Sequence, residues 1–447
     1  MQAQEMIWFI SFLTVFFFLS SLCPPPSAQA QQPLLSPIQK DNLTKLYTLS
    51  AYLKTPLQLT HLQLDLGASE SLTWVDCTSG FESSTFRHLI YTDPVCLEID
   101  YPVLIYSTGN CSNNPDPTCF DGSCDTNAQN PVTLEHILGD ILLDSLALPS
   151  TNGKNPGKLM LDADYVFSCG NTSLLNGMAT GVAGIAMLGR FNFSLPAQLS
   201  RAFSSPSLFA ICLPSSSSGT GLAIFNSYGP YFFSPGIDLS KSLTYTPLLL
   251  NPFGGVIQPY VRASYQYFIG VTGIRVNGRS VPLNKTLLEI DQKDGTGGTT
   301  ISTATPYGIL QTSIFKALKT AFKEAAVSLK LKTSTPVKPF SLCYKAGTVP
   351  STRQGPAVPT IDLVLQSESV IWRISGANSM VNVGGNALCL GFLDGGRNPK
   401  TSIVIGGLQI EDNLLQFDMV SQRLGFSSSV LSQSTTCSNF NFTTNNL

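Results

Sequence analysis

The chain has 447 residues, 43% of them hydrophobic and 12% charged, and a formal net charge of −2 at pH 7. This composition is typical of a folded chain with a sizeable core and excludes a disordered one. The small net charge, without a run of more than two Lys or Arg residues, argues against a nucleic-acid partner. Its 36 glycines and 29 prolines favour an all-β protein with many turns.

The first 30 residues have the pattern of a secretory signal peptide. An apolar run from Ile7 to Leu22 is followed by three prolines and then by Ala28-Gln29-Ala30, a small-x-small cleavage site. A membrane anchor is the alternative, but the run is short for a bilayer and ends at that site. We therefore expect a secreted, soluble protein with no membrane partner.

Short apolar or alternating runs between turn residues predict strands along the chain. They cover residues 46–53, 57–66, 71–75, 165–169, 208–213, 223–225, 267–276, 299–302, 361–365, 380–383 and 402–405. Helical periodicity predicts short helices at 195–202 and 313–331. Both halves show a strand, a loop, a second strand and later a helix, which indicates a duplicated lobe. With the boundary in the Pro/Gly/Ser-rich stretch 228–242, the lobes are residues 31–235 and 236–447.

Ten cysteines follow the expected cleavage site, an even number that predicts disulfides in a secreted chain. Four of them predict a surface loop that is cross-linked by disulfides: Cys96, Cys111, Cys119 and Cys124. No cysteine or histidine has zinc-ligand spacing, so we predict no metal and no cofactor. Six Asn-x-Ser/Thr sequons are candidate glycosylation sites. They are Asn42, Asn110, Asn171, Asn192, Asn284 and Asn441.

Two tripeptides carry the main functional signal. Asp65-Leu66-Gly67 and Ser302-Thr303-Ala304 each follow a strand-like run. A pepsin-like aspartic protease has Asp-Thr-Gly or Asp-Ser-Gly at both places, because its chemistry needs two carboxylates that share one proton around a water. With Ser302 at the second place, we predict no catalytic residue and a relict Asp65.

Further motifs resemble a known family. They are Trp74-Val75-Asp76-Cys77, Phe167-Ser168-Cys169, the Gly-rich run 181–190, Leu342-Cys343-Tyr344 and Ser402-Ile403-Val404-Ile405-Gly406-Gly407. The chain is similar to the plant branch of catalytically inactive aspartic-protease homologues, which includes extracellular dermal glycoprotein, xyloglucanase-inhibiting proteins, nectarins, cereal xylanase inhibitors and legume basic globulins. The resemblance covers essentially the whole mature chain. It implies an all-β, bilobal pepsin-like fold with a few short helices, located in the apoplast or cell wall.

The same resemblance implies a disulfide pattern. The implied pairs are Cys77–Cys169, Cys212–Cys437 and Cys343–Cys389, and the remaining four cysteines would pair among themselves. Close relatives carry two more cysteines, so the disulfide pairing in the loop between residues 80 and 124 must be different here.

The resemblance also implies a monomeric, defence-related inhibitor of a fungal or bacterial endoglucanase or xylanase. In the dermal-glycoprotein group, two loops of the second lobe are implied to present basic residues to the paired catalytic carboxylates of the hydrolase, where charge-assisted hydrogen bonds form in a dry site. The candidates here are Lys332 and Lys338 in the first loop and Arg397 and Lys400 in the second. The best-matched relatives carry arginine near Thr333 and at Lys400, and lysine does not make the same planar fork.

Two alternatives stay open on the sequence. One is a storage-like or peptide-binding extracellular globulin, although the chain shows no marked enrichment in Gln, Asn or Arg. The other is a residual acid protease with a second aspartate displaced to Asp291 or Asp294, upstream of the strand that has to deliver it. Inhibition of a microbial glycoside hydrolase is the function that we predict.

Overall fold

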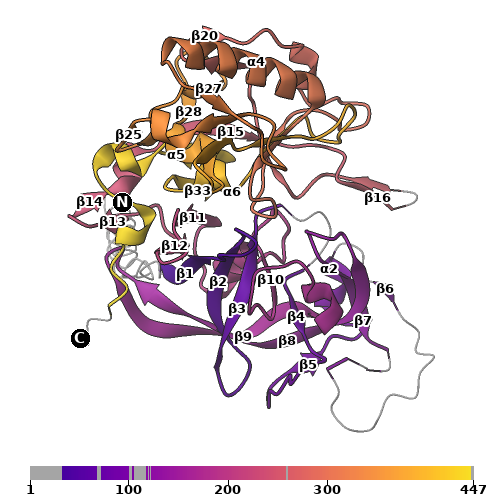
Figure 1. The fold of residues 1–447 in the computed structure, drawn as a ribbon. Coiled ribbons are helices and arrows are strands. Elements are labelled where there is room, and N and C mark those ends of the chain that lie inside the picture. Colours follow the sequence, from indigo (N-terminus) through magenta and orange to yellow (C-terminus); the bar gives the residue numbers. More distant parts are fainter. Residues whose placement is uncertain are drawn as a thin grey trace, which may run out of the picture.

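The computed structural model describes residues 33–67, 72–99, 103–104, 117–118, 120, 122–257 and 260–443. The chain forms two mainly β halves that face one another, one built from the N-terminal residues and the other from the C-terminal residues (Figure 1). This is the all-β, bilobal pepsin-like architecture expected from the sequence. In the described part of the chain, no helix is long and apolar enough to cross a membrane.

A six-stranded antiparallel sheet joins the two halves. Its order is β1 (Leu34–Lys40), β12 (Thr220–Phe225), β11 (Leu208–Cys212), β33 (Leu414–Asp418), β34 (Arg423–Phe426) and β15 (Thr244–Leu249). The pairing crosses between the halves at β11 and β33, where Phe209 stacks on Phe417 with 4.8 Å between ring centroids. Both rings are fully buried, so this sheet forms part of one core shared by the two halves.

Each half repeats one arrangement of five strands. In the N-terminal half the order is β2 (Tyr47–Leu53), β3 (Gln58–Asp65), β10 (Gly184–Met187), β4 (Trp74–Asp76) and β9 (Pro156–Gly170). In the C-terminal half it is β18 (Tyr267–Ile269), β21 (Thr299–Ile301), β32 (Ile403–Ile405), β22 (Gly308–Leu310) and β31 (Phe392–Asp394). The sequence of antiparallel and parallel pairings is identical in both, as an internal duplication requires.

Other strands extend this frame. β8 (His136–Thr151) forms a long hairpin with β9 and also pairs with β7 (Cys124–Gln129) and β5 (Arg87–His88), while β6 (Val103–Leu104) pairs with β7. One C-terminal sheet has the order β20 (Arg279–Ser280), β19 (Gly273–Val276), β27 (Ile361–Val364), β28 (Ile371–Ile374). Another has the order β23 (Thr333–Ser334), β24 (Cys343–Lys345), β30 (Ala387–Leu390), β29 (Met380–Asn382).

Three small hairpins complete the strands. They are β13 (Phe232–Phe233) with β14 (Ile237–Asp238), β16 (Gly255–Ile257) with β17 (Tyr260–Arg262), and β25 (Ser351–Thr352) with β26 (Gly355–Pro356). The lobe boundary placed at residue 235 falls in the turn of the first hairpin, and it stays a prediction.

Helices are few in the described residues. They are α2 (Pro94–Glu98), α3 (Leu195–Ala202), α4 (Thr312–Ser328), α5 (Gly376–Ser379) and α6 (Gly407–Ile410), with 3-10 turns at Thr172–Leu175, Leu239–Ser242, Lys285–Leu287, Ala346–Thr348, Val430–Gln433 and Cys437–Asn439. The predicted helix 195–202 is present with the same bounds. The predicted strand 267–276 is wrong as one element: β18 pairs with β21, whereas β19 joins a different sheet through β27.

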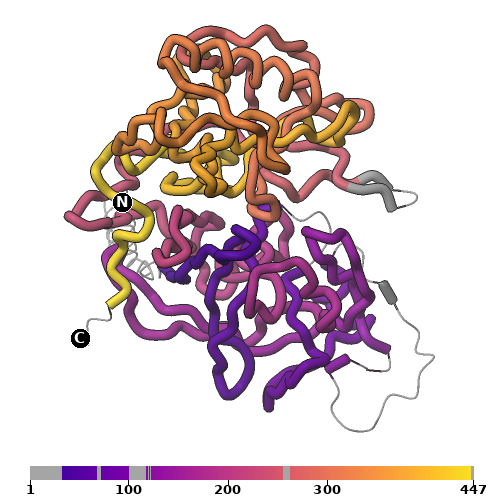
Figure 2. Tube along the Cα trace, in the orientation of Figure 1, coloured from indigo at the N-terminus to yellow at the C-terminus, as the bar shows by residue number. Residues whose placement is uncertain are grey.

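Four disulfides are present in the described residues: Cys77–Cys169, Cys96–Cys124, Cys212–Cys437 and Cys343–Cys389. They include the three pairs that the family resemblance implied, whereas Cys111 and Cys119 lie outside the described residues. The last described residues, yellow in Figure 2, run from the C-terminal half back beside the N-terminal half, where Cys437 is bonded to β11. The chain end therefore ties the two halves together.

Candidate functional site

Asp65 and Ser302 occupy equivalent positions in the two five-strand repeats. Asp65 is the last residue of β3, and Ser302 directly follows β21. The Gly67 amide donates to Asp65 Oδ1 at 2.8 Å, and the Ala304 amide donates to Ser302 Oγ at 3.2 Å. In each repeat the first side chain of the tripeptide thus accepts from the amide two residues later. One repeat offers a carboxylate here and the other offers an alcohol.

Thr303 connects the two loops. Its hydroxyl donates to the Leu64 carbonyl oxygen at 2.8 Å and accepts from the Leu66 amide at 3.1 Å. Gln266 adds a second link, since its Nε2 donates to the Gly67 carbonyl oxygen at 3.0 Å. Asp65 and Thr303 are both fully buried, so the two loops form a fixed unit at the contact between the halves.

The other aspartates considered from the sequence are used elsewhere. Both carboxylate oxygens of Asp76 accept from threonine hydroxyls, Oδ1 from Thr78 at 2.7 Å and Oδ2 from Thr172 at 2.8 Å. Asp291 and Asp294 are exposed in the turn before β21, where each accepts a backbone amide two residues later. These contacts give all three a local structural role.

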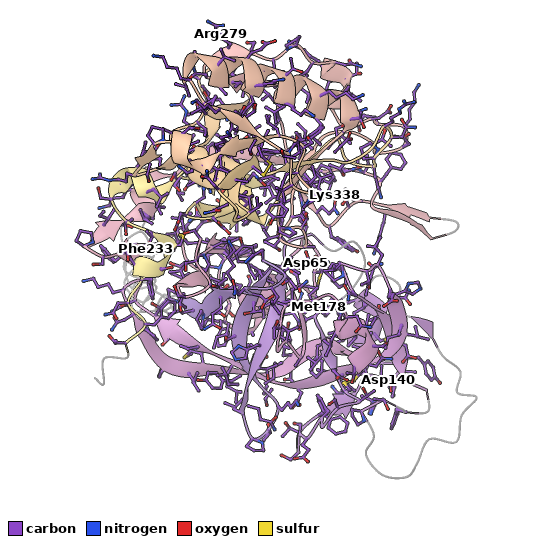
Figure 3. All side chains as sticks on the ribbon, viewed as in Figure 1. Asp65, Asp140, Met178, Phe233, Arg279 and Lys338 are labelled. Atoms are coloured by element: carbon purple, nitrogen blue, oxygen red, sulfur yellow. A yellow bond between two sulfur atoms is a disulfide. The ribbon has the colours of Figure 1, made fainter. Side chains whose placement is uncertain are left out.

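The four basic candidates lie on the C-terminal half. Lys332, Lys338 and Arg397 are exposed, and none of them forms an ion pair within the described residues. Lys400 is held differently, because its Nζ donates to the Gly254 carbonyl oxygen at 3.0 Å. Figure 3 shows Lys338 at the edge of the C-terminal half, on the side that faces the half containing Asp65.

The segments that carry Lys338 and Arg397 pack onto one small core. Phe340, two residues after Lys338, is buried with the Cys343–Cys389 disulfide, and Leu393 packs against the same cluster. The loop after Leu393 is anchored at the start of α4, where Gln311 Nε2 donates to the Arg397 carbonyl oxygen at 2.9 Å. The structure therefore joins these two loops through a common support.

Lys332 lies at the other end of α4. It follows the C-terminal end of this 17-residue helix, which spans about 25 Å at 1.5 Å per residue, whereas Arg397 binds at the N-terminal end. The two lysines of the first predicted loop therefore lie apart. Only the part that carries Lys338 shares its support with the loop of Arg397.

Comparison with known proteins places this geometry in a family. Residues 47–227 match the family model "Xylanase inhibitor N-terminal", and residues 266–428 match "Xylanase inhibitor C-terminal". The probable aspartic proteinase GIP2 of Nicotiana benthamiana is 45% identical over 432 residues, which cover 96% of each chain. The chain belongs to the xylanase-inhibitor-like family.

Three further relatives of this chain have different names. Gamma conglutin 1 of Prunus dulcis is 37% identical and covers 97% of both chains. The crystal structure of edgp superposes with a TM-score of 0.88 at 43% identity, covering 94% of this chain and all of the other. A soybean basic 7S globulin superposes with a TM-score of 0.77 at 28% identity over 92% of this chain. One fold thus serves relatives named as proteinases, conglutins and globulins.

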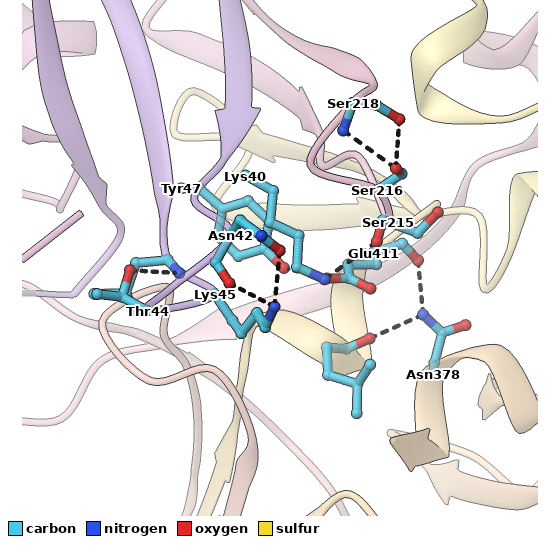
Figure 4. Close-up of polar contacts among 12 residues, drawn as sticks. Lys40, Asn42, Thr44, Lys45, Tyr47, Ser215, Ser216, Ser218, Asn378 and Glu411 are labelled. Atoms are coloured by element: carbon cyan, nitrogen blue, oxygen red, sulfur yellow. Dashed lines mark hydrogen bonds and ion pairs between the residues drawn. The ribbon is translucent and has the colours of Figure 1, made fainter. Parts of the chain in front are cut away.

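Sequence reasoning missed a buried ionic cluster between the halves of this inhibitor-like protein (Figure 4). Glu411 pairs with Lys40 of β1 and accepts from the Tyr47 hydroxyl at 2.6 Å. Burial raises the pKa of Glu411 to about 7, although the Lys40 ammonium and the Tyr47 hydroxyl both act in the opposite direction. Local sequence patterns do not reveal the cluster, because its members are far apart in the chain. Lys40 is in β1, Tyr47 is in β2, and Glu411 directly follows α6.

A second acidic cluster lies in the N-terminal half. Asp125 and Asp140 are register partners on β7 and β8, and His88 Nδ1 lies 3.1 Å from Asp140 Oδ2. Burial, together with the charge of Asp140, raises the pKa of Asp125 to about 6, against the lowering effect of a hydrogen bond from Ser123. The Asp125 carboxyl group therefore keeps its proton in mildly acidic solution.

The described sequons differ in their surroundings. Asn42, Asn192, Asn284 and Asn441 are exposed, Asn171 is half-buried, and Asn110 lies outside the described residues. The side chains of Asn171, Asn284 and Asn441 each accept a hydrogen bond from the Ser or Thr two residues later. Asn42 instead accepts from Lys45 Nζ at 3.2 Å, and this contact turns its side chain toward the ionic cluster described above.

Proposed function

We propose that this protein is a secreted, defence-related inhibitor of a microbial cell-wall glycoside hydrolase, either a xyloglucan-specific endoglucanase or a xylanase. The observation that carries the proposal is the match of both halves to xylanase-inhibitor family models on a fold whose second catalytic position holds Ser302. Binding a partner is a function that the scaffold can perform without hydrolysing a peptide bond.

The same observation argues against a protease. Peptide hydrolysis by this fold needs two carboxyl groups that share a proton. The second tripeptide offers the hydroxyl of Ser302, which does not ionise at acidic pH, so the two tripeptides supply only one carboxyl group between them. We infer that Asp65 was kept for its hydrogen bond to the Gly67 amide.

Inhibition would proceed by insertion of a basic side chain of this protein between the catalytic carboxylates of the hydrolase. The catalytic carboxylates of a retaining glycoside hydrolase lie about 5 to 5.5 Å apart, which leaves room for one ammonium or guanidinium group. Lys338 and Arg397 suit this role best, because both are exposed without an ion-pair partner in the described part of the chain and their loops share a support. Lys400 and Lys332 would act at the rim of the contact.

Secretion is part of the proposal. Four disulfides in the described residues suit an oxidising compartment, and they agree with the signal peptide expected at residues 1–30. We place the protein in the apoplast or cell wall as a monomer, where it would meet enzymes secreted by fungi and bacteria.

A panel of purified fungal and bacterial xyloglucanases and xylanases tests the proposal. We expect the secreted protein to abolish the activity of at least one of them at micromolar concentration or below. Full activity of every enzyme in the panel would contradict it. In that case the conglutin and globulin relatives would favour a storage-like protein of the same fold.

A further inference from the structure

A groove with a volume of about 420 Å³ lies between the halves and is lined by residues of both. Its N-terminal wall comes from the turn between β1 and β2 and from the serines at 215–217. Its C-terminal wall includes Tyr307, Val381 and Asn382. Any group that fills this groove touches both halves at once.

The turn that carries Asn42 is firmly held. Asp41 Oδ2 accepts from both the amide and the hydroxyl of Thr44 at 2.7 Å, and the Lys45 amide donates to the Asp41 carbonyl oxygen at 3.1 Å. Lys45 Nζ donates to the carbonyl oxygen of Asn42 at 2.6 Å and also to its Oδ1. Asn42, which lines the groove, therefore lies in a turn that several hydrogen bonds hold in place.

The groove offers the chemistry that a sugar needs. Asn382 and the serines at 215–217 are exposed and supply hydroxyl, amide and carbonyl groups, while the half-buried ring of Tyr307 and the side chain of Val381 supply apolar surface. The four charged residues that line the groove already have partners: Lys40 pairs with Glu411, Asp41 accepts from Thr44, and Lys45 donates to Asn42. A neutral ligand with hydroxyl groups and apolar ring faces therefore fits better than an ion.

We propose that Asn42 carries an N-linked glycan whose first sugars lie in this groove, against Tyr307 and Val381, and so connect the two halves. Covalent attachment makes the contact intramolecular, and weak hydrogen bonds are then sufficient to keep the groove occupied. The glycan is part of the folded inhibitor scaffold, and this role is independent of any hydrolase partner.

Asn284 provides a matched comparison within the same chain. It is an exposed sequon in a turn, and its Oδ1 accepts from the amide and the hydroxyl of Thr286. Asn284 does not line the groove at Asn42. A glycan on Asn284 would extend into solvent.

The test uses the full chain secreted from plant cells. Glycopeptide mass spectrometry first measures occupancy at Asn42 and Asn284. Hydroxyl-radical footprinting then measures the oxidation rate of Tyr307 in the wild type, in Asn42→Gln and in Asn284→Gln. We expect Asn42 to be occupied, and Tyr307 to be oxidised several-fold faster in Asn42→Gln than in the wild type or in Asn284→Gln.

Trimming the whole glycan from the folded wild-type protein with a peptide N-glycosidase gives the same readout without a genetic substitution, so a folding defect of Asn42→Gln cannot decide the result. Faster oxidation of Tyr307 after trimming supports the proposal. An unmodified Asn42, or an oxidation rate of Tyr307 that stays the same after the glycan is removed, overturns it.

Discussion

Thr303 binds Leu66 across the contact between the two halves, with its hydroxyl oxygen 3.1 Å from the Leu66 amide nitrogen. The same hydroxyl donates to the Leu64 carbonyl oxygen. No equivalent bond can run in the other direction, because the Leu66 side chain has no hydroxyl. One threonine therefore fixes the loop of Asp65 against the loop of Ser302.

Replacing Thr303 by valine should destabilise the protein. The substitution keeps the shape of the buried side chain but leaves the Leu66 amide and the Leu64 carbonyl oxygen without this partner, at a cost of about 1–3 kcal/mol. Thermal unfolding measures the effect. Thr305→Val is the control, since Thr305 is half-buried and its hydroxyl donates to the nearby carbonyl oxygen of Tyr307. Equal melting temperatures for the two variants would contradict the role given to Thr303.

The protein should not hydrolyse peptides at any acidic pH. We expect no turnover of denatured haemoglobin between pH 2 and 6, and no change on Asp65→Asn. Ser302→Asp should place a second carboxyl against the first, and two such groups resist simultaneous ionisation. This variant should therefore be less stable at pH 7 than at pH 4, relative to the wild type. Peptide cleavage by the wild type that disappears in Asp65→Asn would overturn the inhibitor assignment.

Stability should be greatest in mildly acidic solution. The pKa of Glu411 is raised to about 7 by burial, so the folded state binds a proton more tightly than the unfolded chain does. That contribution is fully present below the unfolded pKa of about 4.3 and is lost as pH rises through 7, by on the order of 4 kcal/mol. Asp125, with its pKa raised to about 6, acts in the same direction.

Denaturant unfolding between pH 5 and 8 checks this dependence. Glu411→Gln should remove most of the slope, because an amide does not titrate. Glu135→Gln, at an exposed position, should leave the slope as it is. If Glu411→Gln had the wild-type slope, Glu411 would not be the group that titrates.

Removing the exposed cations should weaken inhibition of whichever hydrolase the enzyme panel identifies. Lys338→Ala or Arg397→Ala should reduce the binding free energy by about 2–5 kcal/mol if that cation is buried between the catalytic carboxylates. Arg279→Ala is the matched control, because Arg279 is also exposed but lies at the far end of the C-terminal half (Figure 3). Inhibition constants that are unchanged in both loop variants would refute the assignment of these loops.

The sequence, read with its family resemblance, was sufficient for the fold and for locating the two tripeptides at Asp65 and Ser302. The tripeptides at Asp65 and Ser302 lie at strand ends in the linear sequence, and the strands β3 and β21 that deliver them are signalled by local apolar runs. Helix α3 was likewise predicted with its observed bounds, because its periodicity and Pro196 are local features. Disulfide pairs needed the family resemblance, since cysteine spacing does not determine pairing.

Tertiary structure decided what depends on contacts between distant segments. The splitting of 267–276 into β18 and β19 follows from two different partner sheets, and a local pattern does not contain that information. The ion pair of Lys40 with Glu411 and the bond from Leu66 to Thr303 join residues from opposite halves of the chain. The burial that sets the pKa of Glu411 arises only when the two halves pack together, and the support beneath Lys338 forms only when distant segments of the C-terminal half meet.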